Sequence, residues 1–304
     1  RFNVARIREI TTTLPGGQIR SFDCAFAGDE MSQTGANGVL CAIWHYDDLE
    51  GDRIDWCTID VATGSIIASG TLTTSAAEVA HPPIRVVALK STDDSWHFYA
   101  FYGNVEFGSG TDLFYVSMPA SLPVAWGAPV AFDTNVTGFD ICVTDPLTTS
   151  RLFYVRSYYE QDYVACSSHT DAGTGALATT STAFYTVATY PINSSIACAC
   201  DPNGRHVAAI LALLTSNDNR VLQWNVTTDG AVSNFFSLSL ITAVGISYYG
   251  NQIGWAGTST VAGLTRWDNW FCSYVDNGRY IGGRTTYVWA NAVGLTLSAA
   301  TNQA

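Results

Sequence analysis

The sequence predicts an all-β protein built from repeated antiparallel meanders of four strands. Residues 196–238 show the repeat most clearly, because three turn segments separate four runs of apolar, β-branched and aromatic residues. The turns lie at residues 201–204, 215–219 and 228–230 and are rich in Pro, Gly, Asn and Asp. These four residue types favour tight turns, whereas β-branched and aromatic residues favour strands. This stretch therefore serves as the template for the rest of the chain.

Four looser copies of the meander occupy most of the remaining chain. Each copy carries turn residues at corresponding places, and equivalent first strands begin near Phe22, Ile84, Phe139, Ile196 and Ala243. A spacing of roughly 40–60 residues between four-stranded units is typical of propeller blades. The predicted repeats span residues 21–74, 84–132, 138–187, 195–239 and 242–290.

A β-propeller accounts for the apolar strands of these repeats. Runs such as residues 207–214 are nearly continuously apolar, so both faces of each sheet must be buried. Blades stacked around an axis cover both faces. We predict a single domain over residues 1–304, most simply with five blades, in which the strand at residues 7–14 closes the ring. A pair of β-sandwiches, and a six- or seven-bladed ring or a fragment of one, are the alternatives.

Composition narrows the range of partners. The chain has 304 residues, of which 47% are hydrophobic and 13% charged, and its net charge is −12 with Lys90 as the single lysine. An acidic, lysine-poor surface repels phosphate backbones, so no nucleic acid partner is expected. No apolar run reaches the roughly 18 residues of a membrane helix, so no membrane insertion is expected.

The cysteines are predicted to be free thiols rather than a disulfide framework. The chain contains 8 cysteines, most of them inside apolar strand runs, and no Cys-x-x-Cys pair. Free buried thiols suit assembly in a reducing cytoplasm. We also expect no metal site and no cofactor, because the five histidines are scattered and no phosphate-binding glycine motif occurs.

The chain resembles, in style, the propeller domains of bacteriophage tail proteins. It shares with them degenerate blades, many Thr, Ser, Gly and aromatic residues, low charge and thiols with no evident pairing. The signature of WD40 repeats is absent, and residues 91–96 are only a degenerate form of the Asp-box of sialidases. The resemblance implies a non-enzymatic structural or binding protein of a virion, which contacts other subunits in a homo- or hetero-oligomer or a host-surface glycan.

The alternative function is a carbohydrate-active propeller, either a glycosidase or a lectin, that is secreted. Asp23 and Asp140 occupy matching positions on predicted innermost strands, and paired carboxylates are the groups that glycosidases use. A third carboxylate has no clear counterpart. Both aspartates could equally bond to neighbouring backbone, in which case the catalytic set is empty.

The predicted binding residues lie at the tip of one hairpin. Tyr158, Tyr159 and Glu160 stand between two apolar strands of the third repeat. Exposed aromatic rings stack on sugars or pack against protein partners. The sequence therefore predicts a surface contact at this tip, whereas the other aromatic residues are expected to fill the core.

Overall fold

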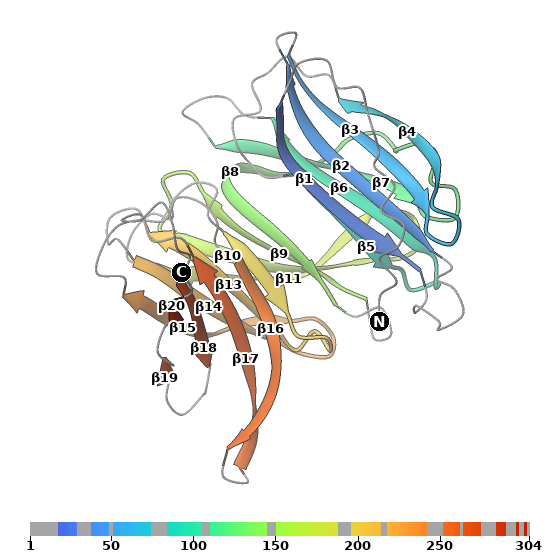
Figure 1. Ribbon diagram of the computed structural model, residues 1–304. Coiled ribbons are helices and arrows are strands. Elements are labelled where there is room, and N and C mark those ends of the chain that lie inside the picture. Colours follow the sequence, from blue (N-terminus) through green and yellow to red (C-terminus); the bar gives the residue numbers. More distant parts are fainter. Residues whose placement is uncertain are drawn as a thin grey trace. The chain divides into compact units, whose positions relative to one another are not determined.

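A computed structural model describes the chain over residues 18–28, 38–48, 51–73, 84–104, 110–144, 150–187, 196–213, 218–241, 252–261, 264–274, 284–289, 296–297 and 301–302. Its regular elements are the β-strands β1 to β20 (Figure 1). Among the described residues, no helix is long and apolar enough to cross a membrane. Contacts between residues divide the chain into two compact units, one of residues 1–134 and 172–176 and the other of residues 135–171 and 177–304.

The first unit contains one complete four-stranded sheet and most of a second. The complete sheet has the order β1-β2-β3-β4, with antiparallel neighbours throughout. The second sheet has the order β5-β6-β7 and continues into the beginning of β8. The strands of this unit are β1 (Gln18–Ala27), β2 (Val39–Asp48), β3 (Gly51–Asp60), β4 (Ser65–Thr73), β5 (Arg85–Lys90), β6 (Trp96–Asn104) and β7 (Thr111–Pro119), with β8 (Val130–Val143) shared with the second unit.

The second unit contains the remaining meanders. The later part of β8 pairs with β9, followed by β10 and β11. The next sheet has the order β12-β13-β14-β15, and the last has the order β16-β17-β18-β19, with β20 beside β18. The strands are β9 (Leu152–Tyr158), β10 (Tyr163–Asp171), β11 (Leu177–Thr186), β12 (Ala197–Cys200), β13 (His206–Leu213), β14 (Asp218–Val226), β15 (Val232–Ile241), β16 (Gln252–Val261), β17 (Leu264–Tyr274), β18 (Arg284–Trp289), β19 (Thr296–Leu297) and β20 (Thr301–Asn302).

These sheets confirm the all-β class, and β1 to β4 and β12 to β15 are four-stranded antiparallel meanders as predicted, whereas β5 to β11 form one continuous 7-stranded sheet. The predicted repeats at residues 21–74 and 195–239 coincide with β1 to β4 and β12 to β15. The number of blades and the closure of a ring remain predictions. The ring-closing strand at residues 7–14 and the predicted first strand of the fifth repeat at residues 242–249 lie outside the described residues.

One strand prediction was wrong. The sequence places a break at residues 133–137 between the second and third repeats, but β8 runs through it without interruption. The segment contains neither Pro nor two consecutive glycines, and Asn135 takes a left-handed conformation with φ of 63°, which bends the strand instead of ending it. In the last sheet β16 lies beside β12, and its Ile253 packs against the cluster that contains Ala197.

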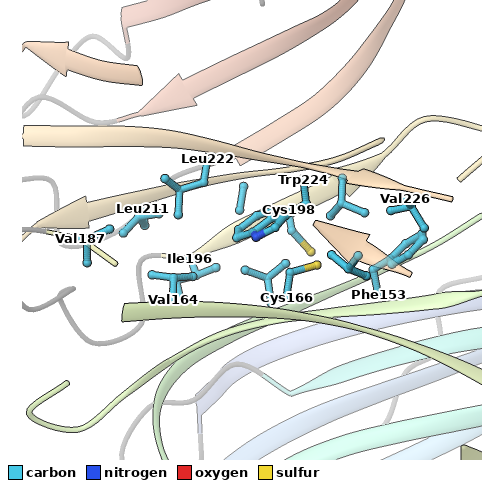
Figure 2. Packing of buried hydrophobic residues seen from close by; sticks show 14 residues of the cluster. Phe153, Val164, Cys166, Val187, Ile196, Cys198, Leu211, Leu222, Trp224 and Val226 are labelled. Carbon is cyan, nitrogen blue, oxygen red and sulfur yellow. The ribbon is translucent and has the colours of Figure 1, made fainter. Parts of the chain in front are cut away.

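The strand β13 shows why its sequence is apolar without alternation. Val207, Ala209 and Leu211 join a cluster that also receives Phe153 and Cys166 from the preceding sheet (Figure 2). The residues between them, Ala208 and Ile210, join a second cluster with Trp270 of the following sheet. Successive side chains of a strand point to opposite faces. Both faces of this sheet are therefore covered by neighbouring sheets within the second unit.

Polar side chains on the third strands fix where the next sheet docks. These side chains belong to Thr58, Ser168 and Gln223, each the last residue before a register shift in its strand. A strand bends at such a shift, and its side chains change direction. Each forms a hydrogen bond with the following meander. The pairs are the Thr58 hydroxyl donating to the Pro123 carbonyl (2.8 Å), the Ser168 hydroxyl donating to the Gly230 carbonyl (2.7 Å), and the Trp270 indole donating to the Gln223 side chain (3.0 Å).

Trp224 tests the packing between β12–β15 and the preceding sheet. Its side chain is fully buried in the cluster that contains Phe153 and Cys166. We expect Trp224→Ala to lower the free energy of unfolding by about 3–5 kcal/mol, because a large cavity replaces the indole ring. Urea unfolding measures this change. The matched control is Trp255→Ala, whose side chain is exposed; an equal loss in both variants contradicts the assignment of Trp224 to the core.

Candidate functional site

The two aspartates predicted from the sequence share one bonding pattern. Asp23 lies on β1, and its Oδ2 accepts the backbone N–H of Val86 on β5 at 2.9 Å. Asp140 lies on β8, and its Oδ2 accepts the backbone N–H of Cys198 at 2.8 Å. Each carboxylate thus bonds to the first strand of the next meander. Each aspartate therefore forms a hydrogen-bonded bridge between strands of two consecutive meanders.

This bonding limits what the two carboxylates can do chemically. The other oxygen of Asp23 accepts the N–H of Cys24 at 2.9 Å, and Asp140 is buried. Asp140, which is buried and bonded to a backbone donor, is therefore positioned for structure, whereas Asp23 is half-buried. Asp23 belongs to the first unit and Asp140 to the second. Their pairing as acid and base stays a prediction.

The hairpin tip predicted as a contact connects β9 and β10. Tyr158 ends β9, Tyr159 and Glu160 form the turn, and Tyr163 begins β10. Glu160 is exposed and has a φ of 54°, and the N–H of Tyr159 donates to the carbonyl of Asn135 at 2.9 Å. The turn is therefore tied to β8, and it presents Glu160 to solvent.

A row of aromatic rings extends from this tip across the outer strands. The rings of Tyr158 and Tyr163 have centroids 5.4 Å apart, and those of Tyr163 and Phe184 are 5.3 Å apart at an interplanar angle of 87°. Phe184 lies on β11 and is 54% exposed. We call Tyr158, Tyr163 and Phe184 the aromatic row. Its outer end offers a large apolar surface to solvent.

Strand register explains how the aromatic row forms. Ala165 on β10 pairs with Arg156 on β9 and with Phe184 on β11, so these residues share one face of the sheet. Tyr163 precedes Ala165 by two residues, and side chains two apart on a strand lie on the same face. Sequence reasoning found Tyr158 but missed Tyr163 and Phe184, because only the register between strands places them together.

Arg156 holds the inner end of the row in place. Its guanidinium carbon lies 4.6 Å from the centre of the Tyr154 ring and 5.6 Å from that of Tyr158. Its Nε donates to the Tyr158 hydroxyl at 2.7 Å, and its Nη1 donates to the Ser167 hydroxyl at 2.7 Å. An arginine placed over aromatic rings is attracted by their π-electrons. Tyr158 is therefore pre-oriented by packing and by a charge-assisted hydrogen bond.

His169 extends this hydrogen-bond network, but it is not suited to act as a general base. Its Nε2 lies 2.8 Å from the Ser167 hydroxyl, and its Nδ1 lies 3.2 Å from that of Thr179. Burial, assisted by the positive charge of Arg156, lowers the pKa of His169 to about 3. The imidazole is therefore neutral at physiological pH, and so weak a base is poorly matched to proton transfer there.

A second exposed side chain lies beside the row. The Asn234 side-chain amide of β15 donates to the Phe184 carbonyl at 2.6 Å, which joins the outer strands of two neighbouring sheets. The adjacent Phe235 is exposed as well. The surface around Phe184 thus includes the side-chain amide of Asn234.

Other candidate groups have structural roles. Within the described ranges, no group of three His, Cys, Asp or Glu side chains is arranged to hold a metal ion. In the degenerate Asp-box, Asp93 accepts hydrogen bonds from Ser91 and Ser95 in the turn between β5 and β6, and these bonds lower its pKa to about 2. They close the turn in the way that Asx motifs do.

Comparison with solved structures places the chain among propeller-like proteins. A fucose-complexed lectin of Aleuria aurantia is 10% identical, with 92% of this chain and 78% of the lectin covered and a TM-score of 0.50. A GH62 hydrolase in complex with xylotriose is 13% identical over 86% of this chain and 88% of the hydrolase, with a TM-score of 0.39. The Chaetomium thermophilum protein Sqt1 is 11% identical over 92% of this chain and 64% of that protein, with a TM-score of 0.44.

The fold assignment rests on the similarity to the Aleuria aurantia lectin. At 10% identity it shows similarity of fold alone, and the scores of the other two structures are too low to add to it. No protein-family model matches the chain, and no curated protein sequence matches it. The fold is therefore all-β and propeller-like, and nothing in these comparisons shows a resemblance to phage tail proteins.

Asp140 tests the bridge between β8 and β12. We expect Asp140→Ala to lower the free energy of unfolding by about 1–3 kcal/mol, because the buried N–H of Cys198 loses its acceptor. Asp140→Asn retains a side-chain carbonyl and should lose less. Asp112→Ala, at an exposed position on β7, is the control and should change stability little. Equal urea midpoints for Asp140→Ala and the wild type exclude the bridge.

His169 predicts how stability depends on pH. Its folded pKa of about 3 lies below the ordinary value of 6.5, so the unfolded chain binds the extra proton between these values. The stabilisation is present above about pH 6.5 and is lost progressively as the pH falls towards 3. Urea unfolding over this range should show a shallower pH dependence for His169→Gln than for the wild type. If the free energy of unfolding changes equally with pH in His169→Gln and in the wild type, the buried neutral imidazole is contradicted.

Proposed function

We propose that this chain is a carbohydrate-binding protein of the β-propeller kind that holds a glycan without cleaving it. The observation that carries the proposal is the aromatic row, which ends at an exposed Phe184 and is anchored at Tyr158 by Arg156. Aromatic faces stack on the apolar faces of sugar rings, while nearby amides and carboxylates bond to hydroxyl groups. Asn234 and Glu160 supply such polar groups.

The comparisons favour this proposal over a role in a phage tail. The Aleuria aurantia lectin, which has the similar fold, is complexed with a fucosylated sugar. The tail and virion assignments have no support from the comparisons, whereas a secreted lectin accords with them. The proposal includes a five-bladed ring in one domain and leaves room for a protein partner as well as a glycan.

Phe184→Ala tests the site directly. The purified chain is applied to a glycan array that carries fucosylated, xylan-derived and arabinan-derived oligosaccharides, and the best ligand is then titrated by calorimetry. We expect Phe184→Ala to weaken binding about tenfold, because one stacking face is worth about 1 kcal/mol or more. Tyr163→Ala, which removes the support under Phe184, should also weaken binding.

The control for this experiment is Ile66→Ala. Ile66 is 54% exposed, as Phe184 is, but it lies on β4 in the first unit. Its replacement should leave the affinity unchanged. Binding that survives Phe184→Ala, or the absence of binding to every glycan on the array, overturns the proposal. If the chain cleaves a glycan and Asp140→Asn abolishes this cleavage, the glycosidase alternative replaces the proposal.

A further inference from the structure

Four thiols gather on the facing sides of two neighbouring sheets in the second unit. Cys142 of β8 and Cys166 of β10 belong to one sheet, and Cys198 and Cys200 of β12 belong to the next. All four take part in the same cluster of side chains. Figure 2 shows the sulfur atoms of Cys166 and Cys198 pointing toward one another. None of the four is part of a disulfide bond in this structure.

Direct contacts join the two sheets at Cys142. The thiols of Cys198 and Cys200 lie close enough to the Cys142 thiol to contribute, after burial, to raising its pKa. The Cys200 thiol also donates to the carbonyl of Val143, the residue after Cys142, at 3.1 Å. The bond from the Cys198 N–H to Asp140 holds β12 against β8 at the same place. The side chains of Cys142 and Cys200 thus already point across the boundary between the sheets.

Exposure separates the four thiols into two kinds. Cys166 and Cys198 are buried, whereas Cys142 and Cys200 are half-buried and keep contact with solvent. Cys142 and Cys200 are therefore the two residues of the four that are nearer to solvent, although the Cys142 thiol itself is buried.

We propose that Cys142 and Cys200 form a disulfide bond when the protein meets a low-molecular-weight disulfide such as oxidised glutathione. One protein thiolate attacks the small disulfide, forms a mixed disulfide and releases one small thiol. The second protein thiolate then displaces the remaining half as a second small thiol. Two electrons pass from the protein sulfurs to the reagent, and the two protons of the protein thiols are taken up by the released thiolates.

The environment sets the rate of this reaction. Burial, followed by the neighbouring thiols, raises the pKa of Cys142 well above its ordinary value. Because the thiolate is the attacking species, the reaction is slow at neutral pH and accelerates as the pH rises. The protein therefore keeps its thiols in a reducing compartment and acquires the crosslink on longer exposure to an oxidising one.

Mass spectrometry tests the proposal. The whole chain carrying Cys24→Ser, which removes an exposed thiol, is incubated with oxidised glutathione at mildly alkaline pH. We expect the mass to fall by two hydrogen atoms, and a non-reduced digest should contain a peptide that links Cys142 to Cys200. The melting temperature should rise by several degrees, because the crosslink constrains the unfolded chain. Dithiothreitol should reverse both changes.

Two further variants control the experiment. Cys200→Ser should abolish the loss of mass, and Cys166→Ser, at a fully buried position in the same cluster, should leave it intact. Circular dichroism before oxidation shows whether each variant is folded. A peptide that links Cys142 to Cys198 instead, stable glutathione adducts without a crosslink, or an unchanged mass in the folded parent chain each overturn the proposal.

Discussion

The sheet formed by β12 to β15 has two apolar faces, and the structure of the second unit depends on covering both. β13 makes the constraint plain, because its alternate residues enter two different clusters. Each cluster removes apolar surface from water at about 25 cal/mol per Å², which is the main favourable contribution to folding. A sheet of this kind is stable only between neighbours, and this is why four-stranded meanders recur along the chain.

Apolar packing leaves the relative position of two sheets poorly defined, and a few polar contacts define it. Asp23 and Asp140 join inner strands through backbone N–H groups, while Thr58 and Ser168 bind the carbonyl of a later turn. A buried donor without an acceptor is costly, so any other alignment of the sheets is disfavoured. The conformation of Gly230 contributes as well, since a Cβ atom there would lie 2.2 Å from the Arg151 side chain, whose guanidinium donates to the Thr228 carbonyl at 2.7 Å.

The sequence predicted those elements whose signals are local. Turn residues and apolar runs located β12 to β15, and matching inner positions identified Asp23 and Asp140. The continuity of β8 was missed, because polar residues resemble a loop when their pairing with β9 is unknown. The aromatic row was found only in part for the same kind of reason. Tyr158 is marked by its hairpin, whereas Phe184 is brought close by the register of two further strands.

The aspartate bridges also bear on how the chain folds during synthesis. Asp23 bonds to Val86, and Asp140 bonds to Cys198, so each bridge joins meanders that follow one another along the chain. The bridges span 63 and 58 residues, so each one needs only the next meander and no more distant part of the chain. As soon as the next inner strand leaves the ribosome, the preceding sheet already presents its acceptor. We therefore expect the meanders to add one after another from the N-terminus, each completed sheet acting as the template on which the next is laid.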